Sequence, residues 1–325
     1  MLIAESTMYH STEPIGILLM ALGGPDSLEA VEPFLKDVRG GRPTPPELIH
    51  EITERYRATG GKSPVLAIMT DLVARLEARL NAAGPPCFRV YVGFRHWHPY
   101  IRETYQEIVK DGVRRLVGLC MAPQNSQLSV GAYVKKVEEA QAESGASIRF
   151  TYVPSWNTHP SLIQGIVANI REALGKFPAD ARDRVAIIFT AHSLPERILK
   201  DGDSYPGQVR ETVEAVRSAL GPLPPAGAWR FAYQSQGRTG DTWLGPTVEE
   251  TLDELHGTGC RYVLMAPIGF VSDHLEVLYD IDIEFRKRAS DKGMQLERMA
   301  MLNATAPFVE TLRDIVTAHL KETGR

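Results

Sequence analysis

Short apolar runs alternate with longer stretches of helical periodicity along this chain, and this alternation is what most restricts its fold. The runs are rich in Val, Ile and Leu, as in IGILLMAL near 15–22 and RVAIIFTA near 184–191. Strands buried on both faces of a parallel sheet have this composition, and the stretches between them supply the crossover helices. The pattern predicts an α/β fold. We expect strands near residues 15–22, 88–93, 114–121, 148–153, 184–191, 229–234 and 261–266, with a weaker one near 295–300.

The chain is long enough for two domains, and its halves resemble each other. Its 325 residues exceed what one hydrophobic core usually organises. IGILLMALGGP, from Ile15, aligns with VAIIFTAHSLP, from Val185, and this alignment sets Leu22 against His192. MAPQNSQLSVGAY and MAPIGFVSDHLEVLY match in the same order further along each half. We interpret these matches as duplicated α/β units with about four strands each, although short strand ends of this composition also coincide by chance.

The segment PSWNTHP at 154–160 interrupts the pattern and indicates the boundary between the halves. We expect domains at 12–156 and 157–325, with the last helix packing back on the first domain. In open α/β sheets ligands bind beyond the carboxyl ends of the strands. The expected walls of one cleft between the halves are the segments 21–27, 122–133, 191–196 and 267–276.

Charge and cysteine content exclude several partners and cofactors. The chain has 36 basic and 40 acidic residues, a net charge of -4, so it lacks the basic surface that nucleic acids require. No apolar run approaches the ~20 residues that cross a bilayer, and the first residues lack a signal-peptide pattern, so we expect a cytoplasmic protein without a transmembrane segment. Cys87, Cys120 and Cys260 form no C-x-x-C pair, which excludes a zinc ribbon and a four-cysteine iron–sulfur cluster.

His192 and a row of carboxylates are the main candidates for chemistry. His192 emerges where a central strand ends, and an imidazole accepts a proton or binds a divalent metal near neutral pH. The alternative is a histidine that merely bonds a neighbouring backbone group. Glu276, Asp280 and Glu284 recur every four residues and climb ~12 Å along one helix face. Such oxygen ligands suit delivery of a divalent ion, whereas the alternative is a solvated acidic face.

Three further motifs are weaker. Gly61-Lys62-Ser63 matches the last three residues of the phosphate-binding loop motif, but Tyr56 occupies the position of the first glycine of that motif. His96 and His98 lie two apart on an irregular segment, so a stacking or polar role is favoured over a chelating pair. Trp243 either offers an apolar plate to a flat ligand or caps the helix that starts at TVEETLDEL.

Three segments of the second half resemble the ferrochelatases, which insert ferrous iron into a porphyrin in haem biosynthesis. They are AHSLPERILKDGDSYPGQV, YQSQGRTGDTWLGPTVEETL and PIGFVSDHLEVLYDIDIEF. LGGPDSLEAVEPFLKDVRGGR, YRATGGKSPVLAIMT and MAPQNSQLSVGAYVKK extend the resemblance to about residues 15–320. It implies two similar Rossmann-like domains, each with a four-stranded parallel sheet, and a lyase that releases two pyrrole protons as the metal enters.

The resemblance also implies roles for single residues. His192 matches the family's metal-binding and proton-accepting histidine, Glu276 matches its carboxylate partner, and Asp280 and Glu284 match the acidic residues that lead outward. Leu22 departs from the pattern, because short bacterial members commonly have a tyrosine there that can reach the iron. The positions expected to contact the porphyrin are Leu22, Arg39, Arg55, Tyr56, Ser63, His96, Tyr133 and Trp243.

The polarity of one segment indicates which porphyrin is used. Family members that use protoporphyrin IX resemble one another in a long hydrophobic lip, whereas DVRGGRPTPPELIHEITERYRATGGKSP is short and polar. Arg39, Arg42 and Arg55 are expected to pair there with propionates, unless they are simply solvated. We favour coproporphyrin III over protoporphyrin IX. A porphyrin or haem carrier would not need the acidic row, and a cobalt chelatase would more typically have extra histidines near Glu276. We expect a monomer without a prosthetic group, with porphyrin and Fe(II) as substrates.

Overall fold

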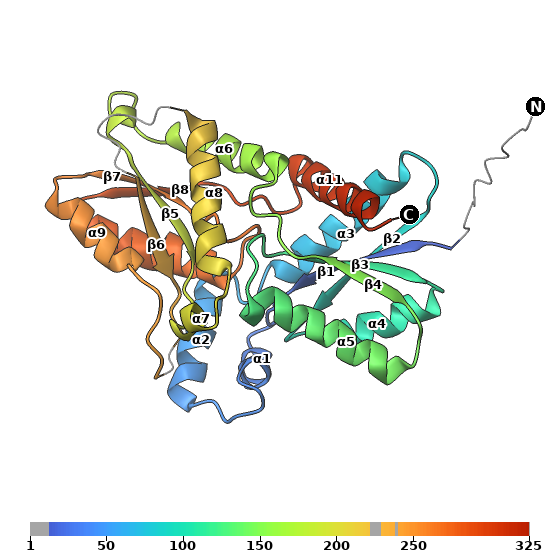
Figure 1. Ribbon diagram of the computed structural model, residues 1–325. Coiled ribbons are helices and arrows are strands. Elements are labelled where there is room, and N and C mark those ends of the chain that lie inside the picture. The colour runs from blue at the N-terminus through green and yellow to red at the C-terminus, as the bar shows by residue number, and fades with distance from the viewer. Residues whose placement is uncertain (1–12, 222–228, 238–239, 325) are drawn as a thin grey trace, which may run out of the picture.

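The computed structural model describes residues 13–221, 229–237 and 240–324, and within these ranges the chain forms two four-stranded sheets (Figure 1). The outermost expected domain bounds, residues 12 and 325, lie outside the described part. The first sheet contains β1 (Ile15–Ala21), β2 (Phe88–Phe94), β3 (Arg115–Cys120) and β4 (Arg149–Val153). The second contains β5 (Ala186–His192), β6 (Trp229–Gln234), β7 (Tyr262–Ala266) and β8 (Gln295–Arg298).

The two sheets have the same topology. Their strand orders are β2-β1-β3-β4 and β6-β5-β7-β8, and all paired strands are parallel. Every strand lies within two residues of its expected bounds, so the predicted α/β fold with two similar parallel sheets is confirmed. The segments that match in sequence occupy equivalent strands: Leu22 directly follows β1, and His192 is the last residue of β5.

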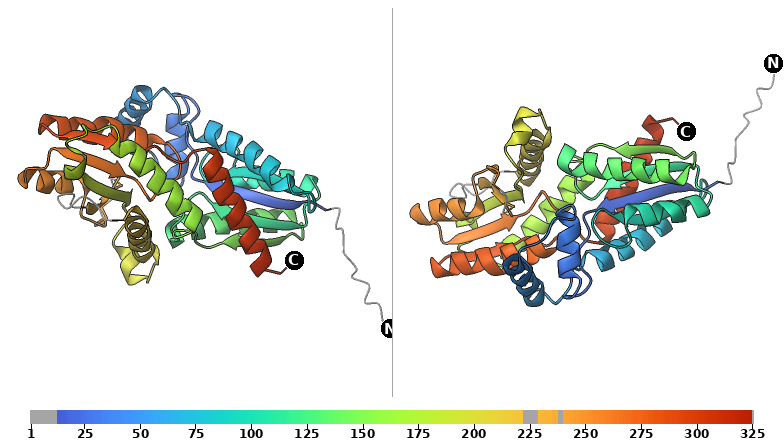
Figure 2. Two further views of the ribbon diagram at one scale, coloured as in Figure 1. Left: turned by 90° about the horizontal axis from the view of Figure 1, so that it is seen from above. Right: turned by 90° about the horizontal axis from the view of Figure 1, so that it is seen from below.

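Helices cover both faces of each sheet (Figure 2). Buried side chains of the first sheet contact α4 and α5 on one face, whereas α3 and α11 pack on the other. The helices of the first half are α1 (Val31–Val38), α2 (Pro46–Ala58), α3 (Val65–Asn81), α4 (Ile101–Lys110), η1 (Gln127–Gly131) and α5 (Ala132–Ser144). Those that follow are α6 (Pro160–Leu174), η2 (Arg182–Arg184), α7 (Arg197–Lys200), α8 (Tyr205–Leu220), α9 (Val248–Gly257), η3 (Glu276–Phe285), α10 (Arg286–Asp291) and α11 (Ala306–Glu322).

One apolar core runs through both halves. Ile17 and Leu19 of β1 belong to the same buried cluster as Ile187 and Phe189 of β5, and this cluster also contains residues of α3, α6, α8 and α11. The last helix, α11, returns to the first half and contacts α3 and β4 as well as α6. The residues between them point to the opposite face of each sheet. Leu18 of β1 and Ile188 of β5 thus belong to two separate buried clusters, one in each half. This shared core fixes the relative position of the two sheets.

The segment after β7 differs from its expected form. The acidic row was expected on an α-helix, but Glu276–Phe285 forms the π-helix η3, in which hydrogen bonds close over five residues instead of four. π-Helical turns are rare and are frequent at functional sites. None of the helices in the described ranges is both long enough and apolar enough to cross a membrane.

A close approach between two strand ends positions the loop before η3. Gly269 donates its N–H to the carbonyl of Thr190 at 3.1 Å. A Cβ atom at Gly269 would lie 2.6 Å from the Cβ and 2.7 Å from the Cα of Ala191, which directly precedes His192. Only a residue without a side chain fits this contact, because the obstructing atoms include backbone.

Gly269→Ala is expected to lower the free energy of unfolding by about 1–3 kcal/mol, since the added methyl group overpacks the junction of β5 with the loop. Chemical denaturation measures the change. Gly207→Ala is the matched control, because a Cβ there meets nothing within 4 Å. Equal stability of the two variants would show that the junction adapts without cost.

Candidate active site

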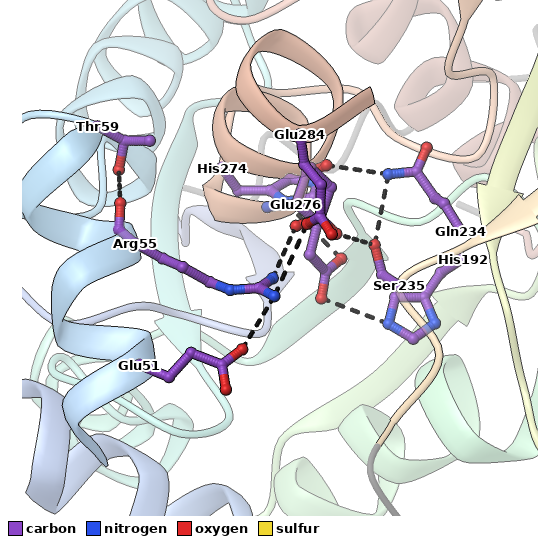
Figure 3. A network of polar contacts seen from close by, with 10 residues as sticks. Glu51, Arg55, Thr59, His192, Gln234, Ser235, His274, Glu276 and Glu284 are labelled. Atoms are coloured by element: carbon purple, nitrogen blue, oxygen red, sulfur yellow. Dashed lines mark hydrogen bonds and ion pairs between the residues drawn. The ribbon is translucent and has the colours of Figure 1, made fainter. Parts of the chain in front are cut away.

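His192 is held at the end of β5 by its backbone and by one ring nitrogen. Tyr205 donates its hydroxyl proton to the His192 carbonyl at 2.8 Å. Nδ1 of His192 faces the carbonyl of Ser193 and therefore carries a proton. This leaves Nε2 as the nitrogen that gains or loses a proton. It lies 3.3 Å from Oε1 of Glu276 (Figure 3).

His192 and Glu276 shift each other's pKa values. Burial alone would lower the pKa of His192, but the opposing Glu276 carboxylate raises it above its usual range. Burial alone would raise the pKa of Glu276, but the nearby imidazole holds it below its usual range. Both shifts favour an imidazolium–carboxylate pair, in which His192 carries the proton. The sequence predicts that His192 and Glu276 lie close together, and the 3.3 Å distance between Nε2 and Oε1 agrees with this.

Two residues that the sequence reasoning missed hold Glu276. The Gln234 side chain, at the end of β6, donates a hydrogen bond to the Glu276 carbonyl at 2.9 Å and accepts one from the Thr190 hydroxyl at 2.8 Å. His274 Nδ1 accepts the N–H of Glu276 at 3.2 Å, and its ring packs edge-to-face on Phe270. Burial lowers the pKa of His274. Their positions in the sequence could have indicated both residues. Gln234 is the last residue of a strand, and His274 lies two residues before Glu276.

The carboxylate row runs from the interior to the surface. Asp280 is only 6% exposed and accepts a 2.6 Å hydrogen bond from Ser235, whose backbone adopts a left-handed φ of 60°. Burial raises the pKa of Asp280 to about 7, against the opposing effects of Ser235 and Arg55. The Glu284 side chain is 50% exposed. The alternative of a solvated acidic face is wrong for this row, because its middle member is buried.

Arg55 closes the outer part of the row (Figure 3). Its guanidinium reaches from α2 to Asp280 at 3.1 Å and to Glu284 at 3.7 Å. It also pairs with Glu51 at 3.0 Å and lies over the ring of Tyr279. The expected pairing of Arg55 with a propionate therefore competes with three carboxylates of the protein itself.

Two hollows lie in different parts of the structure. A cavity of about 250 Å³ beside the row has Arg55, Ser235, Glu249, Asp280 and Glu284 among its walls. A larger hollow of about 880 Å³ beside α1 has Val38, Arg95, His96 and Trp97 among its walls. In the described ranges no three or more His, Cys, Asp or Glu side chains gather closely enough to hold a metal ion, so the acidic groups form a row and not a cage.

The loop after β1 gathers several of the expected porphyrin contacts. A Cβ atom on Gly24 would lie 2.5 Å from Ser63 Oγ and 3.7 Å from the Tyr56 hydroxyl, so this loop lies directly on both side chains. Tyr56 and Tyr133 are both buried, and burial raises the pKa values of both hydroxyl groups. Leu22 is exposed at the end of this loop's strand.

Three other expected contacts make no hydrogen bond or ion pair with His192 or Glu276 among the described residues. His96 Nδ1 pairs with Asp37 at 2.6 Å, while His98 pairs separately with Glu103. Trp243 bridges to Pro195, in the loop after His192. Arg39 ends α1, and no hydrogen bond or ion pair within the described ranges connects it to His192 or Glu276.

Comparisons with known proteins agree with this architecture. The Ferrochelatase family model matches residues 14–320. A ferrochelatase of Herpetosiphon aurantiacus is 44% identical over 301 residues, covering 93% of this chain and 97% of that protein. The coproporphyrin III ferrochelatase of Bacillus subtilis is 36% identical over 317 residues, covering 97% and 100%.

Solved chelatase structures share the fold. SirB from Bacillus subtilis with Fe3+ has a TM-score of 0.58 at 10% identity, covering 94% of each chain. The sirohydrochlorin chelatase SirB from Bacillus subtilis subspecies spizizenii, in complex with cobalt, has a TM-score of 0.56 at 11% identity, covering 95% of this chain and 96% of that one. The span of the family model and the identity to the relatives show that this chain belongs to the ferrochelatase family of metal-inserting enzymes.

Proposed function

We propose that this ferrochelatase inserts Fe(II) into coproporphyrin III, with His192 and Glu276 at the reacting centre. The observation that carries the proposal is the 3.3 Å ion pair between them, from which Asp280 and Glu284 lead to the surface. A carrier of porphyrin or haem would have no use for a buried carboxylate on such a route. An anaerobic insertion assay with Fe(II) and each of two porphyrins tests the proposal.

The proposed role of His192 is to accept pyrrole protons. Two protons leave the macrocycle for each Fe(II) that enters, so a base is needed at its face. Nδ1 is occupied by the Ser193 carbonyl, so Nε2 is the accepting atom. Approach of the cation weakens the hold of Glu276 on the imidazole proton, because the carboxylate then interacts with two positive charges.

Asp280 and Glu284 are proposed as the route for Fe(II). Carboxylates spaced along a line raise the local concentration of a cation without enclosing it. Arg55 occupies this route in the free protein, so the incoming ion has to displace its guanidinium from Asp280 and Glu284.

Coproporphyrin III is proposed as the substrate because of the polar connection between α1 and α2. Arg42 donates to the Arg39 carbonyl, and no carboxylate in the described ranges lies within ion-pair distance of either guanidinium. Both are therefore free to bind propionates of a ligand. The relative from Bacillus subtilis named for coproporphyrin III supports this choice. Protoporphyrin IX is the second candidate, because the relative at 44% identity is named ferrochelatase without a stated porphyrin.

The remaining features of the enzyme stay predictions. We propose that it acts as a cytoplasmic monomer without a resident cofactor or iron–sulfur cluster. Cys87 is exposed, Cys120 is buried and Cys260 is half-buried, and the three are free. Sedimentation of the purified chain and its absorbance spectrum test the oligomeric state and the cofactor content.

The pH profile of kcat/KM tests His192 as the base. Because Glu276 raises the pKa of His192, the free imidazole forms as pH rises, and activity is expected to rise with it. Glu276→Gln is expected to move this acid limb to lower pH, while His192→Ala lowers insertion about 100-fold or more at every pH. Porphyrin binding, followed by fluorescence, should persist in both. An unchanged limb in Glu276→Gln would contradict the assignment.

Metal titrations test the acidic row. Asp280→Asn and Glu284→Gln are expected to raise the KM for the metal about threefold to tenfold, with kcat recovering at high metal concentration, because the row concentrates the cation. Asp291→Asn is the control, since it removes an exposed carboxylate just beyond the row, paired with Lys287. If all three variants behave alike, the row does not guide the metal.

Steady-state kinetics with two porphyrins test the substrate. Coproporphyrin III is expected to have a kcat/KM at least about tenfold above that of protoporphyrin IX, since each propionate paired with an arginine adds about 1.5–3 kcal/mol. Arg39→Gln and Arg42→Gln should narrow this ratio. Arg57→Gln is the control, because Arg57 lies exposed on α2 and pairs with Glu54. A tenfold preference for protoporphyrin IX overturns the substrate and leaves the chelatase activity standing.

A further inference from the structure

The connection between β8 and α11 is bonded to the loop that carries His274. Asn303 donates its N–H to the Val271 carbonyl at 2.9 Å. Its side-chain Oδ1 accepts the N–H of Asp273 at 2.8 Å, and its Nδ2 donates to the Asp273 carboxylate at 2.7 Å. Three hydrogen bonds from one residue therefore fix the backbone directly before His274.

Arg298 holds the other side of the same segment. It ends β8, its side chain is 12% exposed, and it makes two hydrogen bonds to Asp282 of η3, at 2.9 and 2.8 Å. The same guanidinium lies 3.4 Å from Asp273. Residues 274–276 are thus held between two anchored points, Asp273 before them and Asp282 after them.

Asn303 has a backbone conformation that suits this contact. Its φ is 47°, in the left-handed region that Asn tolerates better than most residues apart from Gly. Glycine would therefore accept the same backbone, and what Asn adds is its amide. That amide matches Asp273 in both directions, because it accepts from the backbone and donates to the side chain.

We propose that Asn303 is a positioning residue for the metal-insertion reaction, acting through Asp273 and His274 on Glu276. His274 Nδ1 accepts the N–H of Glu276, and Glu276 lies 3.3 Å from His192. Loosening residues 271–273 allows this chain of contacts to shift, and displacement of a reacting group by about 1 Å costs up to about 100-fold in rate. The proposal rests on the proposed function of the His192–Glu276 pair.

Asn303→Gly and Asn303→Asp test it in the full chain. Asn303→Gly keeps the backbone and removes the amide, and Asn303→Asp sets a carboxylate against Asp273. In both variants kcat for Zn(II) or Fe(II) insertion is expected to fall about tenfold or more, while the dissociation constant for the porphyrin stays within about twofold. A kcat of Asn303→Gly within twofold of the parent overturns the proposal.

Exchanging the two side chains distinguishes a positioning role of Asn303 from a general loss of stability. In Asp273→Asn combined with Asn303→Asp, the amide and the carboxylate trade places across the same hydrogen bond. The double variant is expected to regain kcat to within about threefold of the parent, which is non-additive with the loss in Asn303→Asp alone. A double variant as slow as Asn303→Asp overturns the proposal, and this comparison decides the matter even where Asn303→Gly fails to fold.

Asn169→Ala is the matched control. The Asn169 amide donates to the Ala300 carbonyl at 2.8 Å, so it ties the same connection to α6 without touching residues 271–276. Its kcat is expected to stay within about twofold of the parent, and an equal loss overturns the specific role of Asn303. A parent enzyme that inserts no metal contradicts the proposed function instead, which keeps the two failures distinguishable.

Discussion

The apolar core shared by both sheets is the constraint on which the active site depends. It joins alternate residues of β1 and β5 through α3, α6, α8 and α11, so the two sheets cannot shift independently. All strands of each sheet are parallel, and their carboxyl ends therefore open at the same edge. His192 at the end of β5 meets Glu276 beyond β7 because the loop at Gly269 lies directly on Ala191.

The charges in this cleft are arranged in compensating pairs. A buried carboxylate is costly unless it is hydrogen-bonded or paired, and Asp280 has both Ser235 and Arg55 while Glu276 has His192. In the proposed reaction, the entering metal displaces Arg55 from Asp280 and then weakens the interaction of Glu276 with His192. The pairing thus stabilises the free protein through the same carboxylates that are proposed to bind the metal.

The sequence predicts the strands and the two central residues because both depend on local signals. Runs of Val, Ile and Leu locate the strands within two residues, and strand ends indicate His192 and the segment of Glu276. The π-helix and the partner of Arg55 escaped prediction for a physical reason. Arg55 binds Asp280 across 225 positions of sequence, and Asn303 binds Asp273 across 30, so neither contact exists before the helices pack. A stripe of carboxylates likewise looks solvated until α2 covers it.

Because the two halves have the same topology, equivalent positions can be compared, and they contribute different kinds of side chains to the cleft. Leu22 and His192 occupy equivalent strand ends, and a π-helix follows the equivalent strands β3 and β7 as η1 and η3. The first half contributes the buried hydroxyl side chains of Tyr56, Ser63 and Tyr133 together with the Arg55 guanidinium, whereas the second half contributes His192 and the carboxylates. Divergence of the equivalent positions therefore sets hydroxyl groups and one cation opposite a base and a row of carboxylates, which is the asymmetry that the proposed metal insertion requires.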